Sequence, residues 1–192
     1  EIGFEISRLK AKRNLFSLNT SDLAFTDDET KELLKTAYSK EIDKSTRAQL
    51  TQFTSGWITG LHLLIQSPDI ILDDSMKLLR GNTEDIFNYF TEDIFSKIKP
   101  EYREFLLATS IINNFTAPDA DMLLGISNSE YIISDLIRKN VFIEFIVTEP
   151  HITYSYHQLF AAFLKKTLLI SFNKEKLNDL FLKAASICAA KE

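Results

Sequence analysis

The sequence has 192 residues, of which 45% are hydrophobic, and its formal net charge at neutral pH is -5. This apolar content is enough for a buried core, while the acidic balance argues against a protein that binds nucleic acid along its whole surface. The single cysteine, Cys188, excludes an internal disulfide framework and a CxxC metal site; because this is typical of a reducing compartment, we expect a cytoplasmic protein.

The two ends of the sequence suggest that it is part of a longer protein. The first residue is Glu1 rather than Met, and the last predicted helix has no stop signal. No apolar run approaches the roughly 20 residues that a membrane span needs, and residues 1–12 lack the pattern of a signal peptide. We therefore expect a fragment that does not contact a membrane.

A basic stretch and a short apolar run open the chain. The basic residues within 6–13 are more typical of a solvated surface than of a phosphate site. Residues 15–18 form an apolar run of the kind that ends a strand.

The first well-marked helix begins at Thr26. Thr26 and Glu29 have the spacing of a capping box, and Asp27 and Asp28 between them suit the positive end of the helix dipole. Helix-start chemistry explains these three carboxylates better than metal binding or general acid catalysis does, because acidic first turns are common. The helix should end in the polar segment 39–45.

Two further helices should follow, separated by a tight stop. The first covers about residues 46–53 and ends at 54–56, and the second begins near Trp57. Gly60 lies inside the second helix, where glycine costs about 1 kcal/mol relative to alanine, so we expect another element to pack against its backbone. Ser67-Pro68-Asp69 breaks the chain, and we place a boundary between two units there.

The second unit should open with helices. An irregular amphipathic piece at 70–79 precedes a longer helix at about 83–98, whose apolar stripe is broad enough to face a core. Pro100 opens the next helix, at a position where proline loses no hydrogen bond, and a short helix runs from Thr116 to Gly125. The side chains expected to be buried in the two longer helices are Ile86, Phe90, Ile94, Ile98, Tyr102, Phe105, Leu106, Ile111 and Ile112.

A helix, a β-hairpin and a second helix are predicted in the remaining part of this unit. Ser127 and Glu130 have capping-box spacing, and Asn140 is a suitable left-handed stop. Residues 141–147 and 152–157 alternate as strands, with a turn at 148–150. The period then becomes helical, with Leu159, Phe160, Phe163, Leu164 and Leu168 on the apolar side.

This order of elements is typical of a winged-helix domain. The predicted fold class is therefore mainly α: a helical unit followed by a winged-helix domain with a short β-hairpin, on the border between all-α and α+β. No internal repeat or low-complexity tract argues for another architecture.

No complete catalytic motif is visible. The sequence lacks the phosphate loop Gly-x-x-x-x-Gly-Lys-Ser/Thr, Gly-x-Gly-x-x-Gly, His-Glu-x-x-His and Gly-x-Ser-x-Gly. The three histidines, His62, His151 and His157, are too scattered for a metal site. His62 is expected to be a satisfied core or boundary residue and His151 a turn residue. We expect neither a metal nor catalysis within this segment alone, so it should not be an enzyme.

His157 differs from the other histidines by its position where a strand becomes a helix. The free amides and partial positive charge of a helix start suit an anion, and the same dipole favours a neutral ring that can donate one hydrogen bond to a phosphate oxygen. A histidine that only helps to start the helix is the alternative.

A winged helix can bind DNA or pack against protein. The recognition helix would be residues 130–139, which offer Arg138 and Lys139 but also Glu130 and Asp135, and so no net positive face. A winged helix that packs against protein is therefore favoured.

Five segments occur together in one order: Leu15 to Thr26, Thr54 to Leu61, Ile86 to Phe90, Tyr102 to Ile111, and Tyr154 to Leu164. This set resembles the large ATP-dependent transcriptional activators of the MalT-like type, which are STAND-class signalling ATPases with a LuxR-type DNA-binding domain at the far end.

The resemblance implies a domain order. Residues 1–20 would end an ATPase core, 21–68 would form its helical lid, 69–170 the winged-helix domain, and 171–192 the start of a superhelical sensor domain. The winged helix would hold the ADP-bound resting state until ATP and an inducer release the protein for self-association. ATP or ADP would be the cofactor of the longer parent, with none bound by the fragment alone. The partners would be the ATPase core and sensor domain of the same chain.

The resemblance also implies site residues. His157 would lie near the β-phosphate of the nucleotide, and Gly56, Trp57 and Gly60 would lie on the lid motif near the adenine. Ile58 stands where the family usually has proline. The LuxR-type reader lies outside this segment, so no direct DNA contact is expected.

The function expected from these observations is that of a regulatory lid and winged-helix segment in signal transduction by a MalT-like transcription regulator. The alternative is a free-standing winged-helix protein that binds DNA directly.

Overall fold

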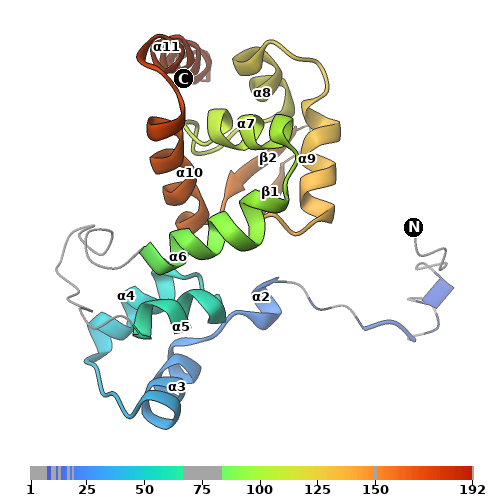
Figure 1. The fold of residues 1–192 in the computed structure, drawn as a ribbon. Helices are drawn as coiled ribbons and strands as arrows, with labels where there is room; N and C mark the ends of the chain where they lie inside the picture. The colour runs from blue at the N-terminus through green and yellow to red at the C-terminus, as the bar shows by residue number, and fades with distance from the viewer. Residues whose placement is uncertain are drawn as a thin grey trace. The chain divides into compact units, whose positions relative to one another are not determined.

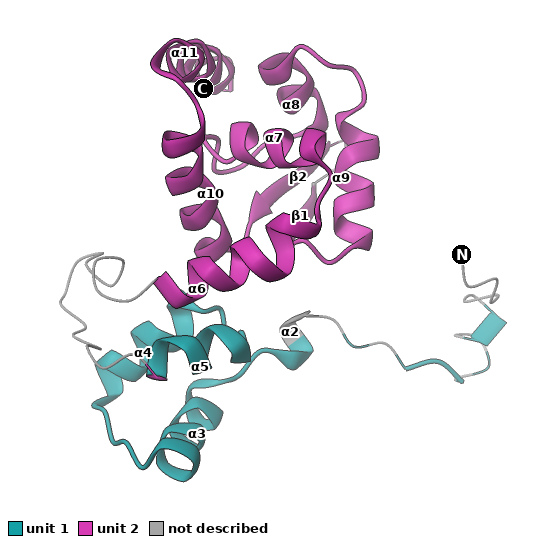
Figure 2. Ribbon diagram, viewed as in Figure 1, with its two compact units in different colours: residues 1–65 teal, residues 66–192 magenta. Residues whose placement is uncertain are grey.

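The computed structural model describes residues 8, 9, 12, 14–16, 18, 20–66, 84–148 and 151–191. The chain divides into two compact units, residues 1–65 and 66–192 (Figure 2), whose helices and strands are labelled in Figure 1. The described helices include none with the length and hydropathy needed to cross a membrane. Mostly helical and with one antiparallel hairpin, the described part of the chain confirms the predicted fold class.

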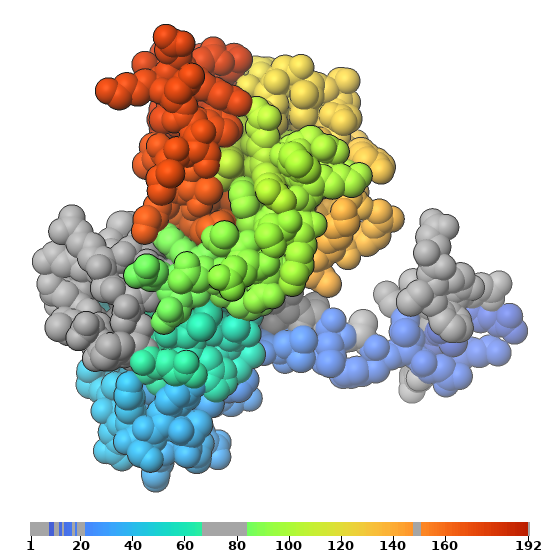
Figure 3. Space-filling view, viewed as in Figure 1, coloured from blue at the N-terminus to red at the C-terminus, as the bar shows by residue number. Residues whose placement is uncertain are grey.

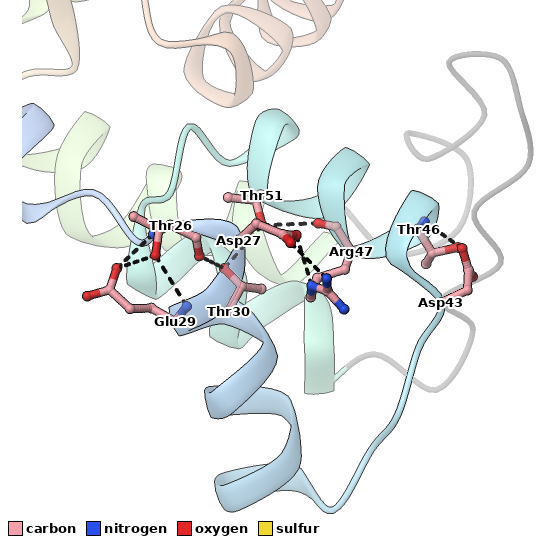
Figure 4. Close-up of polar contacts among 8 residues, drawn as sticks. All are labelled: Thr26, Asp27, Glu29, Thr30, Asp43, Thr46, Arg47 and Thr51. Atoms are coloured by element: carbon pink, nitrogen blue, oxygen red, sulfur yellow. Dashed lines mark hydrogen bonds and ion pairs between the residues drawn. The ribbon is translucent and has the colours of Figure 1, made fainter.

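The first unit is built from the helices α2 (Thr20–Leu23), α3 (Asp27–Tyr38), α4 (Lys44–Phe53) and α5 (Ile58–Gln66). The capping box predicted for α3 is confirmed: the Glu29 amide donates to Thr26 Oγ1 at 3.3 Å, and the Thr26 amide donates to the Glu29 carboxylate at 2.8 Å (Figure 4). Buried leucine and isoleucine side chains form the core of this unit: Leu34, Leu50, Leu61, Leu64 and Ile65.

An ion pair between α3 and α4 was not predicted. Arg47 donates from Nε and Nη2 to the two oxygens of Asp27 at 2.8 and 2.7 Å (Figure 4). This hydrogen bond lowers the pKa of Asp27 and raises that of Arg47. Asp27 therefore belongs to the acidic first turn, as predicted, and also joins the two helices. The helix α4 starts at Lys44, two residues earlier than predicted, because Asp43 caps it by accepting from the Thr46 amide at 3.0 Å.

The strand expected near residues 15–18 is not present in the described part of that run. Residues 14–16 and 18 form neither helix nor strand, and Leu15, Phe16 and Leu18 are exposed. A strand needs a neighbouring strand to satisfy its backbone groups, and none lies beside these residues in the described chain. The amphipathic piece predicted at 70–79 and the break at 67–69 lie outside the described residues.

The second unit begins with a helix that changes its winding. Instead of one helix over 83–98, α6 (Glu84–Tyr89) is followed by the π-helical turn η2 (Phe90–Ile94) and the 3₁₀ turn η3 (Phe95–Lys97). The wider π turn shifts the phase of the apolar stripe. Ile86, Phe90 and Ile98 are consequently buried, while Ile94 is only half-buried.

Two helices then follow much as predicted. Pro100 occupies the first turn of α7 (Pro100–Thr109), and α8 (Ala117–Leu124) has a Thr116–Asp119 capping box and ends at Gly125 with a φ of 68°. Beyond the end of α7 at Thr109, Ile112 is buried as predicted, whereas Ile111 is half-buried.

The capping box predicted at Ser127 is wrong. The helix α9 (Ser129–Arg138) begins two residues later, and its N-cap residue, Asn128, makes no side-chain capping hydrogen bond. Asp121 on α8 instead accepts from the Ser129 amide at 3.0 Å. A side chain from the preceding helix therefore satisfies the helix start, and local spacing could not reveal this.

The hairpin pairs β1 (Ile143–Thr148) with β2 (His151–Tyr156) in antiparallel register, from Ile143 opposite Tyr156 to Thr148 opposite His151. Asn140 is left-handed as predicted, with a φ of 55°, and Phe142 is also left-handed, so the strand starts at Ile143 rather than Val141. Phe115 adds a third strand position on the other side of β2, through two backbone hydrogen bonds to Tyr154. The turn residues 149 and 150 lie outside the described residues.

The helices α10 (Gln158–Ser171) and α11 (Lys174–Ala189) complete the second unit. The five side chains predicted to be buried on α10 are all buried, and α10 packs against α7, as the adjoining orange and green surfaces in Figure 3 show. The centre of the core is an aromatic cluster in which the Phe90 ring lies 5.2 to 5.5 Å from the rings of Phe142, Phe160 and Phe163.

Candidate functional site

His157 connects β2 to α10 and caps the helix. Its backbone amide donates to the Phe142 carbonyl at 2.9 Å, which continues the hairpin ladder. Its ring nitrogen Nδ1 accepts from the Leu159 amide at 3.3 Å, which satisfies one free amide of the first turn. The ring meets Phe142 edge-on at 6.0 Å, and the residue is 6% exposed. The predicted position at a strand-to-helix junction is therefore confirmed, and the capping role is observed directly.

The cap decides which ring nitrogen carries the proton of a neutral imidazole. Because Nδ1 accepts a hydrogen bond, the proton of a neutral His157 ring lies on Nε2. Nε2 is then the donor atom of the neutral ring. This arrangement agrees with the neutral donor expected from the helix dipole.

The start of α10 offers few other groups to a phosphate. Its first turn, Gln158-Leu159-Phe160-Ala161, contains no Lys or Arg, and the Leu159 amide is already used by His157. These residues therefore do not form a complete phosphate site, which needs several backbone amides and a cation.

Gly56 is required by the backbone around it. It has a φ of 70° and follows Ser55, which has a φ of 50°. The Phe25 amide donates to the Gly56 carbonyl at 2.8 Å, and a Cβ placed on Gly56 would lie 2.5 Å from the Phe25 carbonyl oxygen. The segment leading into α3 thus crosses directly over Gly56. This close approach explains the glycine without a ligand.

Trp57 and Gly60 lie on the same turn and helix as Gly56. Trp57 is half-buried, and Gly60 is buried inside α5. Next to them, His62 is half-buried and its Nδ1 is hydrogen-bonded to the Tyr38 hydroxyl, as expected for a satisfied boundary residue. The predicted lid residues are therefore brought together within the first unit, whereas His157 belongs to the second unit.

The recognition helix α9 does not present a basic face. Asp135 is buried and accepts hydrogen bonds from both Arg138 and Lys139, the latter at 2.7 Å. These bonds, first from Lys139 and then from Arg138, lower the pKa of Asp135 to about 2. The two cations available for phosphate contacts are thus paired with a carboxylate on their own helix, which disfavours direct DNA binding.

The wing is apolar rather than basic. Phe145, Ile146 and Val147 on β1 are 53%, 68% and 64% exposed, and Ile152 on β2 is partly exposed. DNA-binding surfaces concentrate Lys and Arg, so this wing is better suited to protein contacts. In the described part of the chain, no three His, Cys, Asp or Glu side chains are grouped to hold a metal ion.

The arrangement of the second unit defines its class. The helices α7, α8 and α9 followed by the β1–β2 hairpin, with Phe115 bridging to β2, make it a winged-helix domain. Residues 91–176 match the family model of the MalT winged helix domain, so this part of the chain is similar to that domain.

Two groups of curated proteins are similar over most of the chain. The serine/threonine-protein kinase PknK of Mycobacterium tuberculosis is 28% identical over 169 residues, which cover 86% of this chain and 15% of that protein. The HTH-type transcriptional regulator MalT of Yersinia pestis is 25% identical over 165 residues, which cover 84% of this chain and 18% of that protein. The chain thus spans less than a fifth of the length of either relative.

Three contacts, one in the first unit and two in the second, were not predicted. Arg47 and Asp121 act on helices other than their own, and Phe115 acts as a strand. A single residue cannot show the alternating pattern of a strand, so the sequence contained no indication that Phe115 pairs with β2. Asp121 carried only a weak one, since an acidic residue near the end of a helix is unfavourable for that helix.

Proposed function

We propose that this chain is the regulatory lid and winged-helix segment of a MalT-like, ATP-dependent transcriptional regulator of the STAND class. In this role it would hold the ADP-bound resting state and relay nucleotide and inducer signals. The observation that carries the proposal is the match of residues 91–176 to the MalT winged helix domain, together with the similarity to the regulator MalT over 84% of the chain.

His157 is the proposed contact to the nucleotide. Its capping bond leaves the proton of the neutral ring on Nε2, from where it would donate to an oxygen of the β-phosphate. Within the first unit, Gly56, Trp57 and Gly60 are the residues proposed to lie near the adenine of a nucleotide bound by the longer parent. The nucleotide would supply the negative charge that holds the winged helix in the resting state.

The remaining parts of the proposal concern the longer parent protein. ATP or ADP would be bound chiefly by a phosphate-loop ATPase core that precedes this segment, and a superhelical sensor domain would follow it. The activated protein would self-associate in the cytoplasm, and a LuxR-type domain elsewhere in the parent would read the operator. The segment itself would have no catalytic activity.

The His157 contact can be tested by titrating ADP into the parent protein by calorimetry. His157→Asn keeps a side-chain oxygen that can cap α10 but removes the imidazole, while His157→Ala removes both. We expect both variants to weaken ADP binding by roughly ten- to a hundredfold, the effect of losing a hydrogen bond to a charged group. His151→Ala, which changes an exposed histidine of β2, should bind normally.

Normal ADP affinity in His157→Asn would show that the residue acts as a cap alone. Weak binding in His157→Ala but not in His157→Asn would have the same meaning, because only the cap distinguishes these variants.

Direct DNA binding is the competing function, and a gel shift with duplex DNA at increasing salt distinguishes it. Phosphate contacts make DNA affinity fall steeply with salt. With Arg138 and Lys139 paired to Asp135, we expect the 192-residue chain to show no such salt-dependent shift. An ATPase assay of the same chain should likewise detect no turnover.

A further inference from the structure

The strand β1 has an open edge in the described part of the chain. The sheet order is β1–β2, with Phe115 bonded to the far side of β2. Residues 144 to 147 of β1 are all exposed, so no described element of the second unit covers this edge.

The backbone groups that face the open edge follow from the hydrogen bonds of β2. The amide and carbonyl of Tyr154 are both bonded to Phe115, at 2.7 and 3.0 Å. The opposite residue on β1, Phe145, is therefore in a non-hydrogen-bonded pair, and its own amide and carbonyl point away from β2. By the two-residue period, those of Ile143 and Val147 also face the open edge.

The side chains at this edge are apolar. Ile143, Phe145 and Val147 share one face of the sheet with Tyr156, Tyr154 and Ile152. This face is buried at the tyrosines and becomes exposed toward the wing tip, where Phe145, Val147 and Ile152 are open to solvent. Edge strands are usually protected by lysine, proline or a bulge, and Glu144 is the only charged residue between 143 and 148.

From this geometry we infer that β1 is a self-association surface, on which β1 of a second copy of this chain adds antiparallel. Self-association is part of the proposed function, and this inference assigns a surface to it; the surface is argued from the strand alone, and its test involves no nucleotide, so it can fail while the nucleotide role stands. A pairing centred on Phe145 places Phe145 opposite itself and Ile143 opposite Val147, so all three outward-facing residues exchange backbone hydrogen bonds. The pattern Ile-x-Phe-x-Val is thus its own complement.

The charge on the strand disfavours the pairing that is shifted by one residue toward Glu144. With Phe145 opposite itself, Glu144 lies opposite Ile146 of the second copy, whereas a pairing centred on Glu144 would place two carboxylates face to face. Like charges directly opposite are destabilising. A second copy therefore fits this edge with apolar contacts on one face and no charge conflict on the other.

The register can be tested with charges at Ile146, whose exposed side chain makes substitution safe for the fold. Sedimentation velocity of the 192-residue chain, from micromolar to millimolar concentration, should show a monomer–dimer equilibrium. Ile146→Lys should strengthen the dimer, because each lysine would lie opposite Glu144 of the other copy, and Ile146→Glu should weaken it. Each change in dissociation constant should be roughly two- to thirtyfold, since two cross-strand pairs change at once.

A rescue variant and a charge control complete the test. The double change Glu144→Lys with Ile146→Glu should restore the dimer that Ile146→Glu weakens. Met122, which is 66% exposed on α8, provides the control: Met122→Lys and Met122→Glu alter net charge equally and should leave the equilibrium nearly unchanged.

Three results would overturn the inference. A chain that stays monomeric at all concentrations has no such surface. A dimer that ignores Ile146 is formed elsewhere on the molecule. Equal weakening by Ile146→Lys and Ile146→Glu would show an apolar contact between copies that does not place Ile146 opposite Glu144.

Discussion

Single residues at the helix starts and turns decide much of the local structure. Thr26, Asp43 and Thr116 each cap the helix that follows them, and their spacing relative to the next helix is a local property. The start of α9 is different because its cap, Asp121, comes from the preceding helix.

Asp121→Ala should therefore destabilise the second unit by about 1 kcal/mol, the usual cost of losing a capping side chain. The matched change at the N-cap itself, Asn128→Ala, should cost much less, because Asn128 makes no side-chain capping bond. Urea unfolding followed by circular dichroism measures both. A larger loss for Asn128→Ala would contradict the cap assigned here to Asp121.

Gly56 and Gly125 form a second matched pair, with φ values of 70° and 68°. A Cβ on Gly125 would meet nothing within 4 Å, whereas one on Gly56 would lie 2.5 Å from the Phe25 carbonyl oxygen. We expect Gly125→Ala to cost about 1 kcal/mol from backbone strain and Gly56→Ala to cost clearly more.

Trp57, the single tryptophan, is the neighbour of Gly56 in the chain. Its fluorescence measures the unfolding of the first unit in the Gly56→Ala variant. Circular dichroism measures the unfolding of the second unit in the Gly125→Ala variant. If both variants lost the same stability, the segment around Phe25 would be able to move away from the added Cβ without a measurable loss of free energy.

At the scale of whole elements, the sequence pattern predicted whether a segment is helix or strand better than it predicted whether a helix runs unbroken. The apolar stripe of residues 83–98 was correctly helical, but the chain changes from α to π to 3₁₀ winding within it. Phe90, the first residue of the π turn, packs against three other phenylalanine rings. Because those rings come from α10 and the segment before β1, the stripe alone could not show where the winding changes.

The charge network of α9 should make the second unit sensitive to acid. Lys139 and Arg138 lower the pKa of Asp135 from its ordinary value of 3.8 to about 2 in the folded protein. The unfolded chain therefore takes up this proton first. The stabilising contribution of Asp135 is complete above pH 3.8 and is lost as the pH falls through about 2.

Asp135→Asn should thus be less stable than the wild type near neutral pH, and the two proteins should converge as the pH falls toward 2. Urea midpoints measured across this range test the expectation. A constant difference between the two proteins would show that Asp135 stabilises α9 by packing and not through its charge.

At the scale of the whole molecule, each unit has a core of its own, and the second is built around aromatic rings. Phe160 is fully buried, and its ring contacts those of Phe90, Phe142, Tyr156 and Phe163. The contributing residues come from η2, the segment before β1, the end of β2 and α10, so this cluster joins the start of the second unit to its hairpin and to α10.

Phe160→Ala should therefore cost about 3 to 5 kcal/mol, the range for removing a buried phenylalanine. Phe181→Ala on α11 removes a half-exposed ring of the same size and should cost less than about 1 kcal/mol, as surface changes usually do. Thermal unfolding of the second unit by circular dichroism compares them. Similar losses would mean that Phe160 is not at the centre of the core.

The sequence by itself determined the helical starts at Thr26, Pro100 and Thr116, the hairpin, the apolar side of α10 and the position of His157 at a strand-to-helix junction. These features depend on residues within a few positions of one another, where periodicity and capping rules apply. Tertiary structure alone decided the cap from Asp121, the Asp27–Arg47 ion pair, the strand role of Phe115 and the open edge of β1. Each of these joins residues that are distant in the chain, and their hydrogen-bonding groups find partners only when the elements pack together.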